Sequence, residues 1–435
     1  MASSGFFIIT LDAVVINVVL PTLARDFHAD MRSLQWVLDS YTLAFAALLL
    51  SAGALSDRLG ARLGFGLGLI IFIFASVGCG LAPTLHVLIA ARICQGAGAA
   101  LMMPSSMSLI RQGYEDPAQR GRAIALWAMG GAVASTSGPV IGGLLAAIDW
   151  RWIFFVNIPA GLATLALLVR TSPSPRRTAP FDYWGQVSAV VAMAALTFSA
   201  IEMGSASGDA TSVLLPLSVA VAALAAFLAL QMYGTHPMVP PSLFRPRNPR
   251  IAMMVGFTFM VGYFGLPFLM SLYLQEQRGL SPVATGATFL PMMLTGLFLT
   301  PFSTRLASRY SSRVVIASGL LLMAAGLGLI AFLPPSTAVP YIGAAMVLVG
   351  LAGPLVAPPM ASVLLTSVPA SLAGTASGVF NTSRQVGGAL AVALFGSLLA
   401  RSPNFLDGLH ISLLLAVGLS LATAIVSLGI EPPNP

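Results

Sequence analysis

The sequence predicts an all-α membrane protein with fourteen transmembrane helices, arranged as two six-helix bundles of similar build with a two-helix insertion between them. Three observations predict this fold class: an apolar composition, fourteen apolar runs of spanning length, and a faint internal repeat. Of the 435 residues, 57% are hydrophobic and 8% are charged, whereas a soluble domain carries about 25% charged residues. So few charges cannot cover a water-facing surface. Composition therefore excludes a soluble globular protein, a disordered chain, a disulfide-stapled secreted domain and a nucleic-acid binder.

Each predicted helix is an apolar run that is long enough to cross the hydrocarbon core, which needs roughly 20 residues. The fourteen runs lie at about 5–24, 34–55, 64–82, 86–110, 123–147, 152–170, 184–204, 211–232, 251–274, 283–304, 314–333, 340–366, 374–400 and 408–430. The first run could be taken for a signal peptide, but Asp12, Asn17 and Pro21 interrupt it and no basic segment precedes it. We therefore expect it to remain as a permanent span.

The distribution of arginine predicts the orientation of these helices. All 21 basic residues are arginine; fourteen lie in the even-numbered loops and five in the odd-numbered loops. Positively charged loops stay on the cytoplasmic side of a membrane, so the even-numbered loops and both termini are expected there. The remaining two, Arg92 and Arg384, lie within spans.

A faint repeat divides the chain into two halves. A pair of arginines follows both the second and the tenth run, at Arg58 and Arg62 and again, 251 positions later, at Arg309 and Arg313. We expect an N-terminal six-helix bundle at 1–170, a linker with two inserted helices at 171–250, and a C-terminal six-helix bundle at 251–435. Parallel repeats of this kind are typical of transporters whose substrate site lies between the halves.

Four short motifs follow one another along the N-terminal half. They are Leu11-Asp12 with Asn17 and Leu20-Pro21, the segment from Gly53 to Arg62, Arg92 with Gln95 to Gly98, and Gly138-Pro139 with Gly142-Gly143. Together and in this order they resemble the signatures of the major facilitator superfamily, specifically of its fourteen-helix drug/proton antiporter family.

The resemblance implies a secondary active exporter of hydrophobic drug-like compounds, cationic ones among them, driven by inward proton flow through alternating access. It implies a small-molecule cargo, protons and a lipid bilayer as partners, with no nucleic acid, no cofactor, no metal and no enzymatic activity. It also implies a monomer in the plasma membrane of a bacterium, with both termini cytoplasmic. The alternatives are a dedicated exporter of one metabolite or antibiotic, and a proton-coupled uptake symporter. An integral-membrane enzyme would need clustered acids, histidines or a metal site, and the sequence offers no such cluster.

Charged residues inside the spans are the candidates for proton coupling. A charge at the centre of a bilayer costs on the order of 2.5–3.5 kcal/mol on insertion scales, so such residues usually face a cavity and have a role. Asp12 is near the middle of the first span, Asp39 is near the outer end of the second, and Arg92 is in the fourth. We expect Asp39 or Asp12 to bind the coupling proton and Arg92 to tune that acid. A static interhelical pair between Asp12 and Arg92 is the alternative.

Two motifs are candidates for controlling the conformation. Asp57, Arg58 and Arg62 are expected to form a cytoplasmic latch that holds the outward-facing state through charged hydrogen bonds and releases on transition; otherwise they are only topology charges. Gly138, Pro139, Gly142 and Gly143 combine small residues with a proline in the fifth helix. Small residues allow close approach and proline bends a helix, so this motif is expected to seal one side of the pore, unless it serves ordinary helix packing.

The last candidates are residues for the wall of a substrate cavity. They are one amide, three aromatic residues and one base, namely Asn17, Tyr41, Trp127, Tyr263 and Arg384. Arg384 could bind an anionic group or only neutralise the cavity. Core or lipid contact is the alternative for the aromatic residues, because most such side chains in an apolar chain pack.

Overall fold

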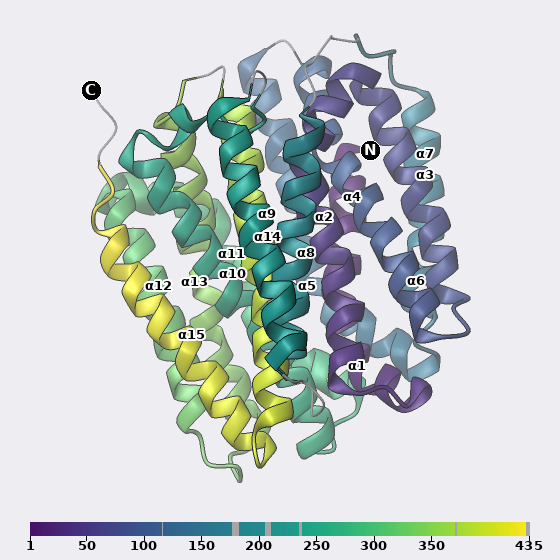
Figure 1. The fold of residues 1–435 in the computed structure, drawn as a ribbon, viewed down its shortest axis with the longest axis vertical. Coiled ribbons are helices and arrows are strands. Elements are labelled where there is room, and N and C mark those ends of the chain that lie inside the picture. The colour runs from purple at the N-terminus through teal and green to yellow at the C-terminus, as the bar shows by residue number, and fades with distance from the viewer. Residues whose placement is uncertain (115, 176–181, 205–209, 235–236, 370–371, 432–435) are drawn as a thin grey trace.

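The structure is a computed structural model that describes residues 1–435 except 115, 176–181, 205–209, 235–236, 370–371 and 432–435. Within some described helices a few side chains, including that of Asp57, also lie outside the description. The described residues form helices and no strands (Figure 1). The helices are α1 (Ala2–Phe27), α2 (Met31–Leu59), α3 (Ala61–Gly80), α4 (Leu85–Gly113), α5 (Pro117–Ile148), α6 (Trp152–Phe155), α7 (Asn157–Val169), α8 (Tyr183–Glu202), α9 (Ala210–Tyr233), η1 (Pro241–Phe244), α10 (Arg247–Leu272), η2 (Tyr273–Gln277), α11 (Pro282–Tyr310), α12 (Ser312–Phe332), α13 (Val339–Thr366), α14 (Ala373–Arg401) and α15 (Phe405–Ser427).

Helices of spanning length dominate the chain. Among the described residues, thirteen helical segments are long and apolar enough to cross a membrane. Only helices and closed barrels satisfy all their backbone hydrogen bonds within hydrocarbon, which is why apolar runs of this length fold this way. The predicted class, an all-helical multi-pass membrane protein, is confirmed.

The predicted span at 152–170 is interrupted in the structure. It consists of two helices, α6 and α7, that meet at Val156. Pro159 has no backbone N–H, and its ring collides with the carbonyl group four residues earlier, that of Phe155. The helical hydrogen bonds therefore break at this point, and α7 restarts with Asn157 at its first position.

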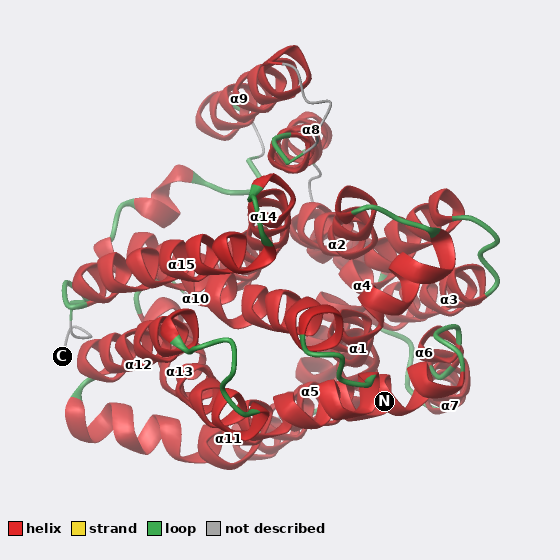
Figure 2. Cartoon of the chain, turned by 90° about the horizontal axis from the view of Figure 1, so that it is seen from below, coloured by secondary structure: helices red, strands yellow, loops and turns green. Residues whose placement is uncertain are grey.

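The inserted helices lie at the edge of the molecule. Seen along the helices, α8 lies beside α2 and α14, and α9 lies beyond α8 (Figure 2). The Gln186 side chain on α8 donates to the carbonyl oxygen of Ala47 on α2 at 2.7 Å. The Ser397 hydroxyl on α14 donates to the carbonyl oxygen of Ala200 on α8 at 2.5 Å. Thus α8 contacts both helices, whereas in α9 Ala220 and Gln231 are the buried residues among those described.

Pro21 creates a contact between the N-terminal and C-terminal helices. Because Pro21 has no N–H, the carbonyl oxygen of Asn17 loses its usual helical donor. The hydroxyl of Ser271 on α10 donates to that oxygen at 2.5 Å, and Gln275 donates to the next carbonyl oxygen, that of Val18, at 2.8 Å. The carbonyl group that Pro21 leaves without a helical donor on α1 thereby gains a hydrogen bond from the other half of the chain.

A second contact joins α2 to α14. The Gln35 amide nitrogen donates to the carbonyl oxygens of Val392 at 3.1 Å and Ala393 at 2.6 Å. Gly396 leaves the space that the Gln35 side chain fills, since a Cβ atom there would collide with it.

Candidate functional site

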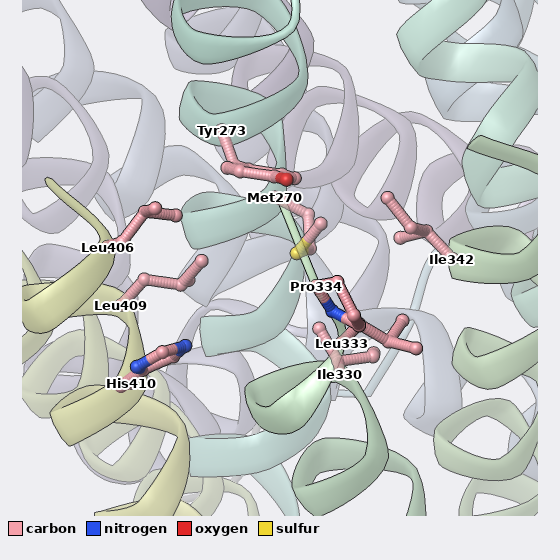
Figure 3. A pocket seen from close by; sticks show the side chains of 9 residues that line it. All are labelled: Met270, Tyr273, Ile330, Leu333, Pro334, Ile342, Leu406, Leu409 and His410. Carbon is pink, nitrogen blue, oxygen red and sulfur yellow. The ribbon is translucent and has the colours of Figure 1, made fainter. Parts of the chain in front are cut away.

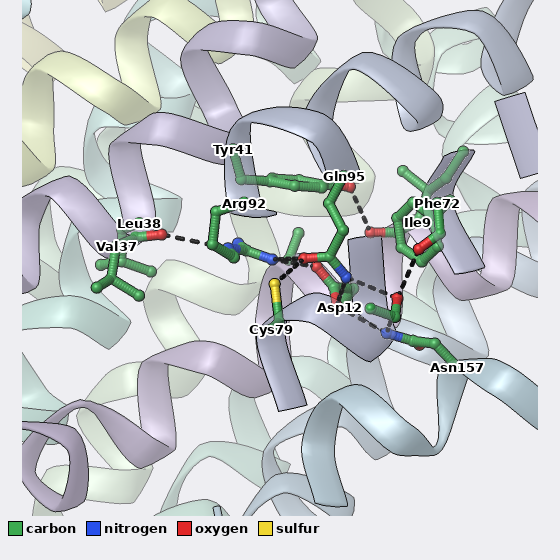
Figure 4. A network of polar contacts seen from close by, with 12 residues as sticks. Ile9, Asp12, Val37, Leu38, Tyr41, Phe72, Cys79, Arg92, Gln95 and Asn157 are labelled. Atoms are coloured by element: carbon green, nitrogen blue, oxygen red, sulfur yellow. Dashed lines mark hydrogen bonds and ion pairs between the residues drawn. The ribbon is translucent and has the colours of Figure 1, made fainter. Parts of the chain in front are cut away.

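A buried ion pair lies at the centre of the N-terminal helices. Asp12 of α1 accepts from the Nη1 group of Arg92 of α4, and both side chains are 1% exposed (Figure 4). An interhelical pair is one of the two alternatives that the sequence leaves open for these residues, which lie on separate spans. The structure brings them into direct contact.

Neutral polar side chains satisfy the rest of this pair. The other carboxylate oxygen of Asp12 accepts from Gln95 at 3.0 Å and from Asn157 at 2.8 Å. The guanidinium of Arg92 donates further to Gln95 Oε1 at 3.0 Å and to the carbonyl oxygen of Val37 at 3.2 Å. A buried charge is tolerable only when it is paired and hydrogen-bonded. Both conditions hold for this pair.

The network extends to two small side chains of α3. Ser76 accepts from Gln95 at 2.8 Å and itself donates to the carbonyl oxygen of Phe72 at 2.8 Å. Cys79 donates its thiol to Gln95 Oε1 at 3.3 Å. Sequence reasoning assigned no role to Gln95, Asn157 or Ser76, although Gln95 belongs to the motif that begins with Arg92. The signal that could have found them is polarity within an apolar span, because an amide in hydrocarbon needs partners.

Tyr41 packs against the pair instead of facing open space. Its ring lies 4.3 Å from the guanidinium carbon of Arg92, and its hydroxyl donates to the carbonyl oxygen of Ile9 at 3.2 Å. A cation over a tyrosine ring is attracted by the negative face of the ring. In this conformation Tyr41 is therefore part of the buried network.

Asp39 is separate from this network. It is fully buried in α2, and neither carboxyl oxygen has a hydrogen-bond partner among the described residues. Its side chain has no surface exposed to solvent in this conformation. Of the three predicted coupling residues, the structure joins Asp12 to Arg92 and leaves Asp39 apart.

The residues of the predicted latch lie at the junction of α2 and α3. Arg62 donates from Nη2 to the carbonyl oxygen of Val169 at 3.1 Å, and its backbone N–H donates to the Ser174 hydroxyl at 3.1 Å. The side chain of Asp57 lies outside the described residues. These bonds join the start of α3 to the end of α7 and the segment after it.

The fifth-helix motif contacts two other helices. A Cβ atom on Gly138 would lie 2.9 Å from Val14 of α1. A Cβ atom on Gly143 would lie 2.7 Å from the carbonyl oxygen of Pro282 and 2.8 Å from Val283, both at the start of α11. Gly142 has a similarly close neighbour, since its Cβ would lie 3.1 Å from the carbonyl oxygen of Val15.

Pro139 of the same motif also approaches α11. Its carbonyl group lies against Gly286, where a Cβ atom would collide with it. The Thr136 hydroxyl also reaches α11, donating to the carbonyl oxygen of Met293 at 3.2 Å. The motif therefore lies where the fifth helix packs against the other half of the chain.

The residues predicted for the cavity wall have different surroundings. Asn17 is buried, and its Oδ1 has no partner among the described residues. Trp127 is half-buried, stacks on Phe6 with ring centroids 4.0 Å apart, and donates to Ser106 at 3.0 Å. Tyr263 stacks on Phe259 of the same helix at 4.9 Å.

Two pockets lie away from these residues. One, between α10, α12, α13 and α15, has a volume of about 20 Å³ and is lined by Tyr273, Leu333 and His410 among others (Figure 3); such a space holds about one water molecule. The other has a volume of about 430 Å³ and lies between α3 and α7, beside Arg62. None of the predicted cavity residues lines either pocket.

Comparisons with known proteins assign the family. The family model of the Major Facilitator Superfamily matches residues 2–392. The methylenomycin A resistance protein of Streptomyces coelicolor is 35% identical over 423 residues, which cover 96% of this chain and 88% of that protein. The multidrug resistance protein Stp of Mycobacterium tuberculosis is 34% identical over 402 residues, covering 91% and 74%.

A solved structure shares the fold. The crystal structure of a peptide transporter POT in complex with sulfate superposes with a TM-score of 0.73 at 13% identity, covering 99% of this chain and 93% of that one. The family model spans nearly the whole sequence, and the two resistance proteins are similar over most of their length. The chain belongs to the Major Facilitator Superfamily.

Proposed function

We propose that this protein is a secondary active exporter of hydrophobic drug-like compounds that exchanges its cargo for inward-moving protons. The observation that carries the export proposal is the similarity to proteins named for methylenomycin A resistance and multidrug resistance. A chain with many spanning helices and buried charges suits a carrier of such compounds.

The proposal includes a topology. Counting α2, which has 29 residues, the chain would cross a bacterial plasma membrane fourteen times with both termini in the cytoplasm. Residues 1–170 and 251–435 would form the two bundles, with 171–250 as the inserted linker. The protein would act as a monomer, without a cofactor and without enzymatic activity.

The contacts between the halves support alternating access. In the proposed orientation, the bonds from Ser271 to Asn17 and from Gln35 to Ala393 lie in the outer halves of their helices. The innermost such bond among the described residues joins Thr382 to the carbonyl oxygen of Ala46, near the middle of both helices. We therefore interpret this conformation as closed on the outside. Opening the outer side requires these bonds to break.

Asp39 is the better candidate for the proton carrier. A buried carboxylate without a partner costs several kcal/mol, of order 2.5–3.5 on insertion scales, so burial without partners favours the neutral, protonated group. In an outward-open state the group would meet outside water and take up a proton there, and closure of the outer side would bury it in the protonated form. Release to the cytoplasm then requires water to reach Asp39 from the inner side later in the cycle.

Asp12 and Arg92 have a different proposed role. Asp12 receives three hydrogen bonds, from Arg92, Gln95 and Asn157, which fix the position of its carboxylate. The pair would then hold α1 and α4 together through the transport cycle. This is the static alternative considered for Asp12, and it leaves Asp39 to carry the proton.

Flux measurements in proteoliposomes test the proposal. The probes are a cation, a neutral compound and an anion, namely ethidium, N-dansylglycinamide and N-dansylglycine. We expect at least one probe to move against its gradient when a pH gradient is imposed, and to stop when the gradient is collapsed. Asp39→Asn should abolish this movement, and Asp407→Asn, at an exposed helix start, should not. Transport that persists in Asp39→Asn would overturn the assignment of the proton carrier.

A dedicated exporter of a single antibiotic is the second candidate. It is supported by relatives that are named for one compound, such as the methylenomycin A resistance protein. A drug-susceptibility screen of cells that express the chain separates the two candidates. Protection against one compound alone favours the dedicated exporter, and protection against several unrelated compounds favours the multidrug exporter.

A further inference from the structure

Arg384 is a half-buried cation near the middle of α14. It follows the helix start at Ala373 by eleven residues, which at about 1.5 Å per residue is roughly 17 Å along the axis. The hydrocarbon core is about 30 Å thick. In a helix that crosses the membrane, the guanidinium is therefore far from the headgroups on either side.

The partners of Arg384 are weak. Nη1 donates to Asn381 Oδ1 at 3.4 Å and Nη2 lies 3.8 Å from the sulfur of Met260. Nε is buried and has no partner among the described residues. The rings of Phe259 and Phe380 each lie 5.9 Å from the guanidinium carbon. None of the ion pairs formed by the described residues includes Arg384.

The contrast with Arg92 indicates what is missing. Both arginines lie inside spanning helices, but Arg92 has the Asp12 carboxylate and two strong acceptors. A guanidinium has five N–H donors, and its geometry matches the two oxygens of a carboxylate. Arg384 presents this donor set with no carboxylate beside it. An anion brought from outside the protein would complete it.

The neighbours of Arg384 indicate the rest of such a molecule. Phe259, Phe380 and Met260 place aromatic and thioether surface beside the guanidinium, and Tyr263 stacks on Phe259. These side chains come from α10 and α14, the helices that also contact the N-terminal half. An aromatic or aliphatic body would pack against this surface while its charged group binds the guanidinium.

We propose that Arg384 binds the carboxylate of a hydrophobic organic anion, which makes anions a cargo class of this protein. This inference rests on the proposed export function and narrows its cargo. A lipid headgroup could supply the same chemistry, but the depth of Arg384 along α14 favours a molecule that enters the protein.

Equilibrium binding to the purified protein tests the site without any transport. Fluorescence anisotropy of N-dansylglycine is compared with that of N-dansylglycinamide, which differs only in having an amide for the carboxylate. We expect the carboxylate to bind at least tenfold more tightly. Arg384→Gln should remove this preference and Arg384→Lys should keep part of it. Arg401→Gln, at the exposed end of the same helix, is the matched control and should change nothing.

Three results would overturn the inference. The first is equal affinity of the unsubstituted protein for the two probes. The second is an unchanged preference for the carboxylate in Arg384→Gln, and the third is a loss of affinity in that variant that is equal for both probes. Displacement of N-dansylglycine by phosphatidylglycerol but not by benzoate would instead assign the site to lipid and also overturn the cargo. The proposed function is judged separately by gradient-driven flux of any of the three probes, so binding can fail while export stands.

Discussion

Gly60 and Ser311 have nearly the same backbone conformation, 251 residues apart in the chain. Gly60, between α2 and α3, has φ 85° and ψ 136°; Ser311, between α11 and α12, has φ 70° and ψ 145°. The offset equals that of the repeated arginine pairs. Side chains rarely adopt this region of φ and ψ, which is favourable mainly for glycine. The two loops thus share one turn, and only the first has the residue that suits it.

Substitutions at these two positions should differ in their effect on stability. Gly60→Ala should lower the melting temperature of the purified protein, because positive φ costs a side chain about 1–2 kcal/mol and the new Cβ would lie 2.9 Å from the carbonyl oxygen of Ser174. Ser311→Gly should be neutral or raise the melting temperature. Gly418→Ala, a helical position with no neighbour within 4 Å, is the control. Equal destabilisation by all three variants would contradict this account.

Asp12 and Asp39 should differ in what their loss affects. Asp12→Asn leaves Arg92 buried without a counter-ion, and breaking a buried pair costs about 3–5 kcal/mol, so thermal stability should fall sharply. Asp39→Asn removes no hydrogen bond of the described structure and should keep stability within about 0.5 kcal/mol. Thermal unfolding in detergent measures both. A larger loss in Asp39→Asn than in Asp12→Asn would show that the pairing in this conformation does not stabilise the protein.

Gly143→Ala should open the outer side of the protein. Its Cβ would lie within 2.8 Å of backbone atoms of Pro282 and Val283, so α5 and α11 must separate. Spin labels at Ile148 and Tyr341, both exposed and near the helix ends that face outside in the proposed orientation, should report a longer distance in the variant. Gly374→Ala, with no neighbour within 4 Å, should leave that distance unchanged. An unaltered distance in Gly143→Ala would remove the motif from the proposed outer seal.

The cap of α2 should make stability depend on pH. Burial raises the pKa of Asp30, but hydrogen bonds from Ser33 and the nearby charge of Arg32 outweigh it, so its pKa lies below the ordinary value. A pKa that is lower in the folded state than in the unfolded chain stabilises the folded protein at pH values above the unfolded pKa, near 3.9. This contribution is lost as the pH falls through the folded-state pKa.

Variants of Asp30 test this dependence. Asp30→Ala should cost about 1 kcal/mol at pH 7, the usual value of an N-cap. Asp30→Asn also caps a helix but does not titrate, so the acidic loss of stability should be smaller than in the unsubstituted protein. Thermal unfolding between pH 3 and pH 7 measures the difference. Identical pH profiles for the two proteins would exclude Asp30 as the titrating group.

The charge of the cargo should determine how strongly transport responds to voltage. One proton entering while one monoanion leaves moves two charges in the same electrical direction, whereas a neutral cargo moves one. A membrane potential contributes about 2.3 kcal/mol per charge per 100 mV, so a potential of about 59 mV changes the accumulation ratio about tenfold per charge. N-dansylglycine should therefore respond about 100-fold to a valinomycin-imposed tenfold potassium gradient. A tenfold response would indicate that only one charge moves.

The spanning helices could be predicted from the sequence because hydrocarbon leaves a polypeptide few choices. A run of apolar residues must satisfy its backbone hydrogen bonds internally, so length and composition are enough. The interruption at Val156 also has a local cause in the sequence, because Pro159, three residues later, breaks the helical hydrogen bonds there. The membrane class and most helix ends belong to this part of the prediction.

The partners of the buried charges were decided by tertiary structure alone. Asp12 and Asp39 have the same side chain, and both lie in apolar helices, yet Asp12 receives three hydrogen bonds and Asp39 receives none among the described residues. Arg92 has a carboxylate partner, whereas none of the ion pairs formed by the described residues includes Arg384. The sequence alone shows that a charge in a spanning helix is costly to bury, because the cost depends on the type of residue and on its position along the helix. Which charge has a neighbour to offset that cost depends on how helices from distant parts of the chain pack, and this only the folded structure decides.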